Sequence, residues 1–267
     1  MLPFAKAHAY GNDFLYVASA DVRGAALDVL AREMCDRHTG IGADGLILHD
    51  RVDRDAVMRL FNADGSRAEV SGNGVRALGA LLLDHETRAS AELTVRTEGG
   101  IKRLTRLGRD GSRQTFRASM GAPADIRQIT VSVSGESLTA VVMNMGNPQC
   151  VVLGRLPDVE RFRRLGSALE RHQSFPDGTN VEFAQVESPD LVRILIWERG
   201  VGPTTSSGTG SCASLVAAAS FGGAARRAEV AAPGGTQTVD WQDEVFLTGW
   251  AEVVCTGTWL RQIPRTS

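Results

Sequence analysis

The sequence predicts an α+β fold built from two similar lobes, and two observations carry this prediction. The motif Ser-Gly-x-Gly occurs at residues 71–74 and again at 207–210, each time directly before an apolar stretch of helical character. The segments around each motif also share one order: strands, an amphipathic helix, more strands, then the glycine turn and its helix. We therefore expect an N-terminal lobe of residues 1–117 and a C-terminal lobe of residues 118–267, whose last strand can pair back with the first lobe.

The first lobe is expected to wrap strands around one apolar helix. Apolar residues at helical spacing predict an amphipathic helix over residues 27–38 and the apolar helix over residues 75–86. A strand is predicted over residues 57–66, ending in an Ala63-Asp64-Gly65-Ser66 turn. Antiparallel strands are predicted between residues 92 and 118, where apolar and polar side chains alternate.

The second lobe repeats this order. An amphipathic helix is predicted over residues 156–172, and a helix of small apolar residues over 212–222. Strands are predicted from the β-type segments at residues 130–135, 138–146, 150–154, 180–186 and 192–200.

Composition excludes several classes of function. The chain has 267 residues and a net charge of -2, so it lacks the basic footprint of a nucleic-acid-binding protein. No stretch approaches the roughly 20 apolar residues that span a bilayer, and the first residues do not read as a signal peptide, so a cytoplasmic location is expected. The cysteines lie far apart without metal-ligand spacing, which predicts free, mostly buried thiols and no metal site: Cys35, Cys150, Cys212 and Cys255.

The repeated motif suits the binding of an anion. A helix N-terminus presents backbone N–H groups without helical partners and the positive end of the helix dipole, and glycine lets a ligand approach them. A serine that only caps its helix contributes about 1 kcal/mol and needs no second copy. The duplication in two similar lobes therefore favours a carboxylate held by two helix ends.

Six segments, in order, resemble the diaminopimelate epimerase family: HAYGNDFLYV (8–17), RHTGIGADGLI (37–47), FNADGSRAEVSGNGVR (61–76), GNPQCVV (146–152), FPDGTNVEF (175–183) and WERGVGPTTSSGTGSCAS (197–214). The likeness runs from about residue 5 to residue 260. It implies two lobes, each with strands around a central helix, and a free amino acid bound between them. It also implies an isomerase of lysine and cell-wall precursor biosynthesis that needs no pyridoxal phosphate or metal and forms a homodimer.

The resemblance also assigns residues to roles. It places catalysis at Ser71 and Ser207, and substrate binding at Asn12, Asn62, Gly72, Asn73, Asn147, Asn180, Glu198, Arg199, Gly208 and Thr209. Glu198 is in addition a candidate catalytic carboxylate, and Gln149 is a further candidate for substrate binding beside Asn147. The set suits a zwitterion, because the helix ends and Arg199 can donate to a carboxylate, while Glu198 and amide oxygens can accept from an ammonium group.

The chain departs from the family at the two proton-transfer positions. The family uses a cysteine on each face of the α-carbon, and Ser71 and Ser207 stand there in this sequence. An alcohol is a far weaker acid than a thiol, and a helix dipole worth at most about 2 kcal/mol does not close that gap. Cys212 lies more than a helical turn past Ser207 and is expected in the core. Gln149 stands where the family usually has histidine, which removes a titrating group.

Three functions stay open at this point. The chain is a diaminopimelate epimerase, active or inactivated by its serines; a proton-shift isomerase that uses a carboxylate, Glu198 first and Asp64 second; or a non-catalytic amino-acid-binding paralogue. Gln149 and the altered residues 203–206 favour natural divergence over a deliberate replacement of both cysteines. A serine hydrolase is not expected, because no histidine lies in a motif that would bring it to Ser207.

Overall fold

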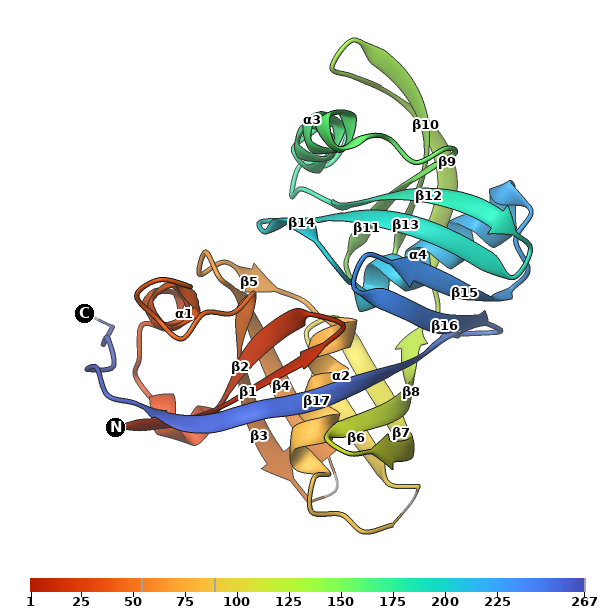
Figure 1. Ribbon diagram of the computed structural model, residues 1–267. Helices are drawn as coiled ribbons and strands as arrows, with labels where there is room; N and C mark the ends of the chain where they lie inside the picture. Colours follow the sequence, from red (N-terminus) through yellow and green to blue (C-terminus); the bar gives the residue numbers. More distant parts are fainter. Residues whose placement is uncertain (54, 89, 267) are drawn as a thin grey trace. The chain divides into compact units, whose positions relative to one another are not determined.

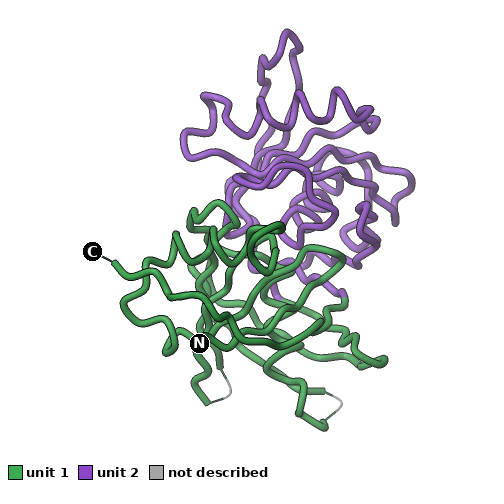
Figure 2. Tube along the Cα trace, turned by 60° about the vertical axis from the view of Figure 1, so that its left-hand side comes forward, with its two compact units in different colours: residues 1–118, 250–267 green, residues 119–249 purple. Residues whose placement is uncertain are grey.

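The computed structural model describes residues 1–53, 55–88 and 90–266. The chain forms two compact units, Met1–Ala118 with Trp250–Ser267 and Ser119–Gly249 (Figure 2). The sequence places residues 118–267 in the second lobe and lets the last strand pair back with the first lobe, and the end of that strand lies in unit 1. The reason is pairing: the end of the last strand runs antiparallel to the first, with Leu2 opposite Trp259.

Unit 1 consists of strands around one central helix. Its helices are α1 (Leu27–Cys35) and α2 (Gly72–Leu82), with a 3-10 turn at Ser19–Val22. Its strands are β1 (Leu2–Ala9), β2 (Asn12–Ala18), β3 (Gly45–Val52), β4 (Asp55–Asn62), β5 (Arg67–Ala68), β6 (Glu92–Thr97), β7 (Gly100–Asp110) and β8 (Arg113–Gly121). Helix α2 packs against β1, β2 and β7 (Figure 1).

Unit 2 has the same composition of elements. Its helices are α3 (Val159–Glu170) and α4 (Gly208–Ala217), the latter continued by a π-helical turn at Ala218–Gly222. Its strands are β9 (Ala124–Val133), β10 (Glu136–Asn144), β11 (Pro148–Leu153), β12 (Asn180–Ser188), β13 (Leu191–Glu198), β14 (Gly202–Thr204), β15 (Arg227–Ala232), β16 (Gly235–Trp241) and the first part of β17 (Val245–Trp259). Helix α4 packs against β11, β12, β13, β15 and β16 (Figure 1).

The two units share one strand topology. In unit 1, β2 is antiparallel to β1 and parallel to β3, and β4 is antiparallel to β3 and parallel to β6. In unit 2, β11 is antiparallel to β10 and parallel to β12, and β13 is antiparallel to β12 and parallel to β15. The predicted α+β class with two similar lobes is confirmed, because each unit repeats the same pairing around its own helix.

The strand register fixes which residues correspond between the units. Phe14 on β2 lies opposite Gly45 on β3, and Gln149 on β11 lies opposite Asn180 on β12. Counting along the parallel strands from these pairs, Gln149 corresponds to Phe14, and Glu182 corresponds to Ile47.

Both central helices begin earlier than predicted. The periodicity predicted starts at residues 75 and 212, whereas α2 begins at Gly72 and α4 at Gly208. Apolar periodicity does not reveal a first turn made of small residues, and the preceding serine satisfies an N–H group of that turn. Cys212 lies fully buried within α4, as expected.

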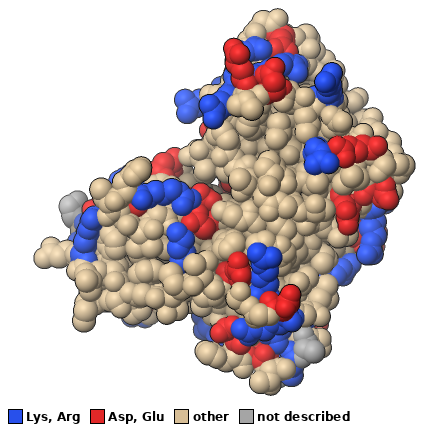
Figure 3. Space-filling view, viewed as in Figure 1, with Lys and Arg blue, Asp and Glu red and all other residues tan. Residues whose placement is uncertain are grey.

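No helix among the described residues is long and apolar enough to cross a membrane. On the face drawn in Figure 3, acidic and basic side chains are interspersed rather than gathered by sign.

Candidate active site

The two serines take the same position at the start of their helices. Ser71 and Ser207 are in an extended conformation, with φ of -127° and -137°. The Oγ of Ser71 accepts from the N–H of Gly74 at 3.1 Å, and that of Ser207 from the N–H of Gly210 at 3.2 Å. Each serine is therefore an N-cap, and the N–H groups at the first helical positions keep no partner within their helix. We call residues 71–74 the α2 end and residues 207–210 the α4 end.

A chain of hydrogen bonds supports the α2 end. Arg76, which is fully buried, donates to Oδ1 of Asn73. Asn73 donates through Nδ2 to Oδ1 of Asn12 at 3.1 Å, and Asn12 donates through Nδ2 to the Asp44 carboxylate at 2.7 Å. This series of hydrogen bonds thus joins the predicted residues Asn12 and Asn73 to the Arg76 guanidinium at one end and to the Asp44 carboxyl group at the other.

The anionic end of this chain belongs to a cluster of charges. Asp13 pairs with Lys6 at 2.9 Å and with Arg37 at 2.7 Å, and Arg37 also reaches Asp44 at 2.8 Å. Burial alone would raise the pKa of Asp13, but hydrogen bonds from Arg37 and Lys6 outweigh it and lower that pKa. Burial and the charge of Asp13 raise the pKa of Asp44. Arg37, which pairs with both aspartates, therefore holds in place the Asp44 carboxyl group that accepts from Asn12.

Asn62 lies at the end of β4, directly before the Ala63–Ser66 turn that the sequence predicts. It donates through Nδ2 to Oγ of Ser66 at 3.0 Å. Asp64, the second carboxylate candidate, is exposed and accepts from the N–H of Ser66 at 2.8 Å and from its Oγ at 2.6 Å. Asp64 closes its own turn, so nothing in this geometry prepares it to accept a proton from a ligand.

A second set of predicted residues meets at the α4 end. Gln149 donates through Nε2 to Oδ1 of Asn147 at 2.6 Å, and Asn147 donates through Nδ2 to Oγ1 of Thr209 at 3.4 Å. The opposite end of the Gln149 amide lies 3.1 and 3.2 Å from the two carboxyl oxygens of Glu182. Glu182 is fully buried. This half of the candidate site rests on amides and one interior carboxyl group.

Asn180 positions the loop after β13. Its Oδ1 accepts from the N–H of Arg199 at 3.1 Å, and its Nδ2 donates to the carbonyl of Pro148 at 3.1 Å. The Arg199 guanidinium donates to the carbonyl of Asp177 at 3.1 Å. Glu198 lies half-buried at the end of β13. Asn180 thereby ties the Glu198–Arg199 pair to the loop that contains Asn147.

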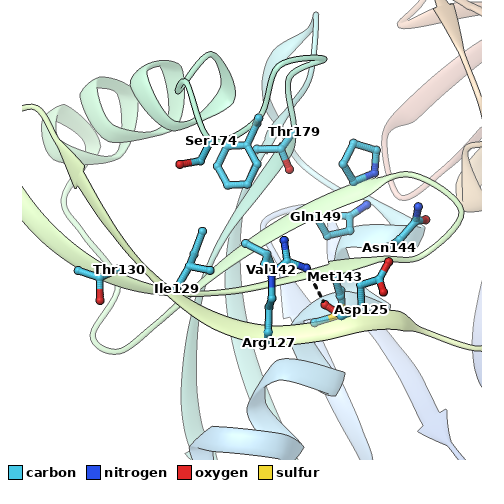
Figure 4. A pocket seen from close by; sticks show the side chains of 12 residues that line it. Asp125, Arg127, Ile129, Thr130, Val142, Met143, Asn144, Gln149, Ser174 and Thr179 are labelled. Carbon is cyan, nitrogen blue, oxygen red and sulfur yellow. Dashed lines mark hydrogen bonds between the residues drawn. The ribbon is translucent and has the colours of Figure 1, made fainter.

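A cavity of about 580 Å³ lies beside these residues in unit 2. Pro148, Gln149, Thr179 and Arg127 are among the residues that line it (Figure 4). The Arg127 guanidinium donates to the carbonyl of Asp125 at 3.3 Å. The chain neighbours of Asn147 and Asn180 therefore form part of a cavity wall.

Sequence reasoning missed three supporting residues: Asp44, Arg76 and Glu182. Each lies inside one of the six motifs, but none carries a chemical signal by itself. The available signal was a charge at an inward position of an otherwise apolar element, as for Glu182 between Val181 and Phe183 and for Arg76 between Val75 and Ala77.

Comparisons with known proteins agree with this geometry. A sequence model of the family described as diaminopimelate epimerase matches residues 4–125 and 141–254. The diaminopimelate epimerase of Desulforudis audaxviator is 42% identical, with 97% of this chain and 100% of the relative covered. That of Bacteroides thetaiotaomicron is 37% identical, with 96% and 97% covered.

Solved structures give the same fold. A probable proline racemase from Agrobacterium radiobacter superposes with a TM-score of 0.78 at 15% identity, covering 98% of this chain and 94% of that one. A hydroxyproline epimerase from Agrobacterium vitis gives 0.72 at 17% identity, covering 96% and 90%.

Two units with one topology, each presenting a serine-capped helix end beside an ordered asparagine, define an amino-acid epimerase of the type that works without pyridoxal phosphate. Within that class, the chain belongs to the diaminopimelate epimerase family.

Proposed function

We propose that this chain binds diaminopimelate, or a close diamino dicarboxylic acid, and belongs functionally among the epimerases that invert an α-carbon of that substrate. The observation that carries the proposal is the pair of equivalent capped helix ends, each with an asparagine held beside it. The naming of relatives up to 42% identical as diaminopimelate epimerases supports the choice of substrate.

The proposed roles follow from the chemistry of each group. The α2 and α4 ends and Arg199 take carboxylates, while Glu198 and the asparagine oxygens take ammonium groups. Ser71 and Ser207 are proposed to occupy the two positions at which the family has its proton-transfer groups. We also propose a cytoplasmic homodimer without nucleic-acid or membrane partners.

Proton transfer by the serines is expected to be slow. Each Oγ already accepts a hydrogen bond as an N-cap, and an alcohol remains protonated at neutral pH. Glu198 is the proposed proton acceptor in this chain, because it is a half-buried carboxylate at the end of β13, directly before Arg199.

The test is proton NMR in heavy water, following loss of the α-hydrogen signal of diaminopimelate. The parent protein is compared with Ser71→Cys/Ser207→Cys, with Glu198→Gln and with both changes together. We expect the double cysteine variant to exchange faster than the parent by about 10²–10⁴-fold, the contribution of a positioned proton-transfer group.

The outcomes separate the open functions. Slow parent exchange that Glu198→Gln abolishes supports the carboxylate role. Exchange only after the cysteines are introduced means that the pocket has lost its bases. Binding of diaminopimelate without exchange by any variant would identify a binding paralogue and overturn the epimerase proposal.

A further inference from the structure

Glu182 occupies an interior position that unit 1 fills with an apolar side chain. A Cβ added to Gly210 at the α4 end would lie 2.5 Å from Oε1 of Glu182, and one added to Gly74 at the α2 end would lie 2.8 Å from Cδ1 of Ile47. Because unit 1 builds the same topology with isoleucine, the fold does not require a carboxyl group here. A buried carboxyl group is unfavourable unless it is hydrogen-bonded, so Glu182 needs a hydrogen-bond partner in the interior.

The partner is Gln149, which is also buried and corresponds to the apolar Phe14. Its amide can face Glu182 in either of two orientations, since amide oxygen and nitrogen differ only by the bonds that they make. The state of the Glu182 proton decides between them.

With Glu182 protonated, every bond of the network has a donor and an acceptor. The carboxyl O–H donates to Oε1 of Gln149, over 3.1 or 3.2 Å. Gln149 then donates to Oδ1 of Asn147, and Asn147 donates to Oγ1 of Thr209. The Thr209 hydroxyl only accepts in this chain, so its hydrogen can be donated to a ligand at the α4 end.

With Glu182 ionised, donor and acceptor must exchange in each hydrogen bond of the network. Gln149 turns so that Nε2 donates to the carboxylate, which brings its oxygen to 2.6 Å from Oδ1 of Asn147. Two acceptors at that distance repel, so Asn147 turns as well and its oxygen accepts the hydrogen of the Thr209 hydroxyl. The Thr209 hydroxyl hydrogen is then bonded to Asn147 and cannot be donated to a ligand.

We propose that Glu182 is a protonated positioning residue whose proton sets the direction of the Gln149–Asn147–Thr209 chain, so that the Thr209 hydroxyl donates to a carboxylate of the bound amino acid. This inference rests on the proposed function, which places a carboxylate at the α4 end. A bound carboxylate is expected to be held more weakly once Glu182 loses its proton.

The surroundings of Glu182 favour the protonated form. Burial raises the pKa of Glu182 well above its ordinary value, and the charge of Glu198 on β13 raises it further. On β11, burial and the neighbouring Glu182 raise the pKa of Cys150. Glu198 opposes a negative charge on Glu182, Cys150 stays a neutral thiol, and neither can supply a positive charge that would favour an ionised Glu182.

The first test is calorimetric titration with meso-diaminopimelate across pH, for the parent, Glu182→Gln and Thr209→Val. We expect parent affinity to fall about fivefold to tenfold relative to Glu182→Gln as pH rises, the equivalent of one hydrogen bond. Glutamine keeps a donor toward Gln149 and does not titrate, and comparison at equal pH cancels the titration of the ligand. Thr209→Val should bind weakly at every pH. A constant affinity ratio between the parent and Glu182→Gln would overturn the inference.

The second test reads the proton directly and needs no ligand. Infrared difference spectra between neutral and alkaline pH should contain a protonated-carboxyl band that Glu182→Gln removes. Glu198→Gln is the matched control: it should keep the band and move its loss to lower pH, because one source of the raised pKa is gone. Absence of the band in the parent overturns this inference and leaves the proposed function standing. A normal band together with no binding by parent or Glu182→Gln overturns the proposed function.

Discussion

In unit 1 the two corresponding interior positions hold Phe14 and Ile47, of which Ile47 lies against Gly74 at the α2 end. The hydrogen bonds that orient Asn12 and Asn73 end instead at Arg76 and Asp44. In unit 2 the corresponding interior pair is Gln149 and Glu182, and this pair is itself the network. Both arrangements fix an asparagine beside a capped helix. One does so with ionised groups, and the other with amides and a carboxyl group favoured in its neutral form.

The difference predicts opposite responses to pH. The lowered pKa of Asp13 means that its contribution to the α2 network is present above the unfolded-state pKa and is lost as pH falls. The raised pKa of Glu182 means that its favourable neutral form is lost as pH rises. The network at the α2 end should therefore weaken as pH falls, and the network at the α4 end should weaken as pH rises.

The largest expected effect is that of Asp13→Asn. This change leaves Lys6 and Arg37 without their shared carboxylate, and we expect a loss of about 2–4 kcal/mol of unfolding free energy. The loss stays below that of a fully buried pair because the Arg37 side chain is 53% exposed. Urea unfolding at neutral pH measures it, with Asp28→Asn, in an exposed pair with Arg32, as the control. Equal losses for both variants would contradict a special role for the cluster.

The next effect compares a methyl group at the two helix ends. Gly210→Ala pushes a Cβ against a Glu182 oxygen that is tied to Gln149, whereas Gly74→Ala meets the rotatable end of Ile47. We expect Gly210→Ala to destabilise by about 1–3 kcal/mol more than Gly74→Ala in urea unfolding. Because Glu182→Val removes the obstacle, Gly210→Ala should cost less in a Glu182→Val background than in the parent. Equal destabilisation by both alanines would refute the asymmetry.

A smaller effect is the pH dependence of stability that Glu182 brings. Between its unfolded pKa, near 4.3, and its raised folded value, only the folded state holds the proton, so stability falls by up to about 1.4 kcal/mol per pH unit. We expect Glu182→Gln to lose this slope and to exceed the parent in stability at alkaline pH. Glu136→Gln is the control, because hydrogen bonds from Arg161 and Arg164 lower the pKa of Glu136 to about 2. Glu136 therefore makes stability depend on pH only in acid. Parallel curves for the parent and Glu182→Gln would rule the effect out.

The sequence predicted the fold and singled out residues that the structure joins by hydrogen bonds, such as Asn12 with Asn73 and Gln149 with Asn147, because both rest on local patterns. Serine before Gly-x-Gly signals a capped helix, and its repetition signals two equivalent lobes. For the last strand, the sequence indicated pairing with the first lobe but not its register, since pairing over more than 240 residues, as between Leu2 and Trp259, leaves no local signal. The roles of Arg76 and Glu182 were hidden for a related reason: what a buried charge does depends on partners from other strands.

The smallest predicted effect concerns thiols placed at the two helix ends. The thiol introduced by Ser71→Cys lies at the start of the helix that contains the buried cation Arg76, and the one introduced by Ser207→Cys lies in the unit with Glu182 and Glu198. Both helix ends lower a thiol pKa, but a cation adds to this effect and a carboxylate opposes it.

We therefore expect the thiol at position 71 to be the more acidic by about one pKa unit, equivalent to 1.4 kcal/mol. The pH dependence of iodoacetamide alkylation of each single variant measures the difference. Because Cys255 is exposed in the parent, the experiment is done in a Cys255→Ser background. Adding Glu198→Gln should lower the thiol pKa at position 207 and leave that at position 71 unchanged. A lower pKa at position 207 than at 71 would mean that the helix dipoles, and not the charges around them, decide the acidity of groups at these two ends.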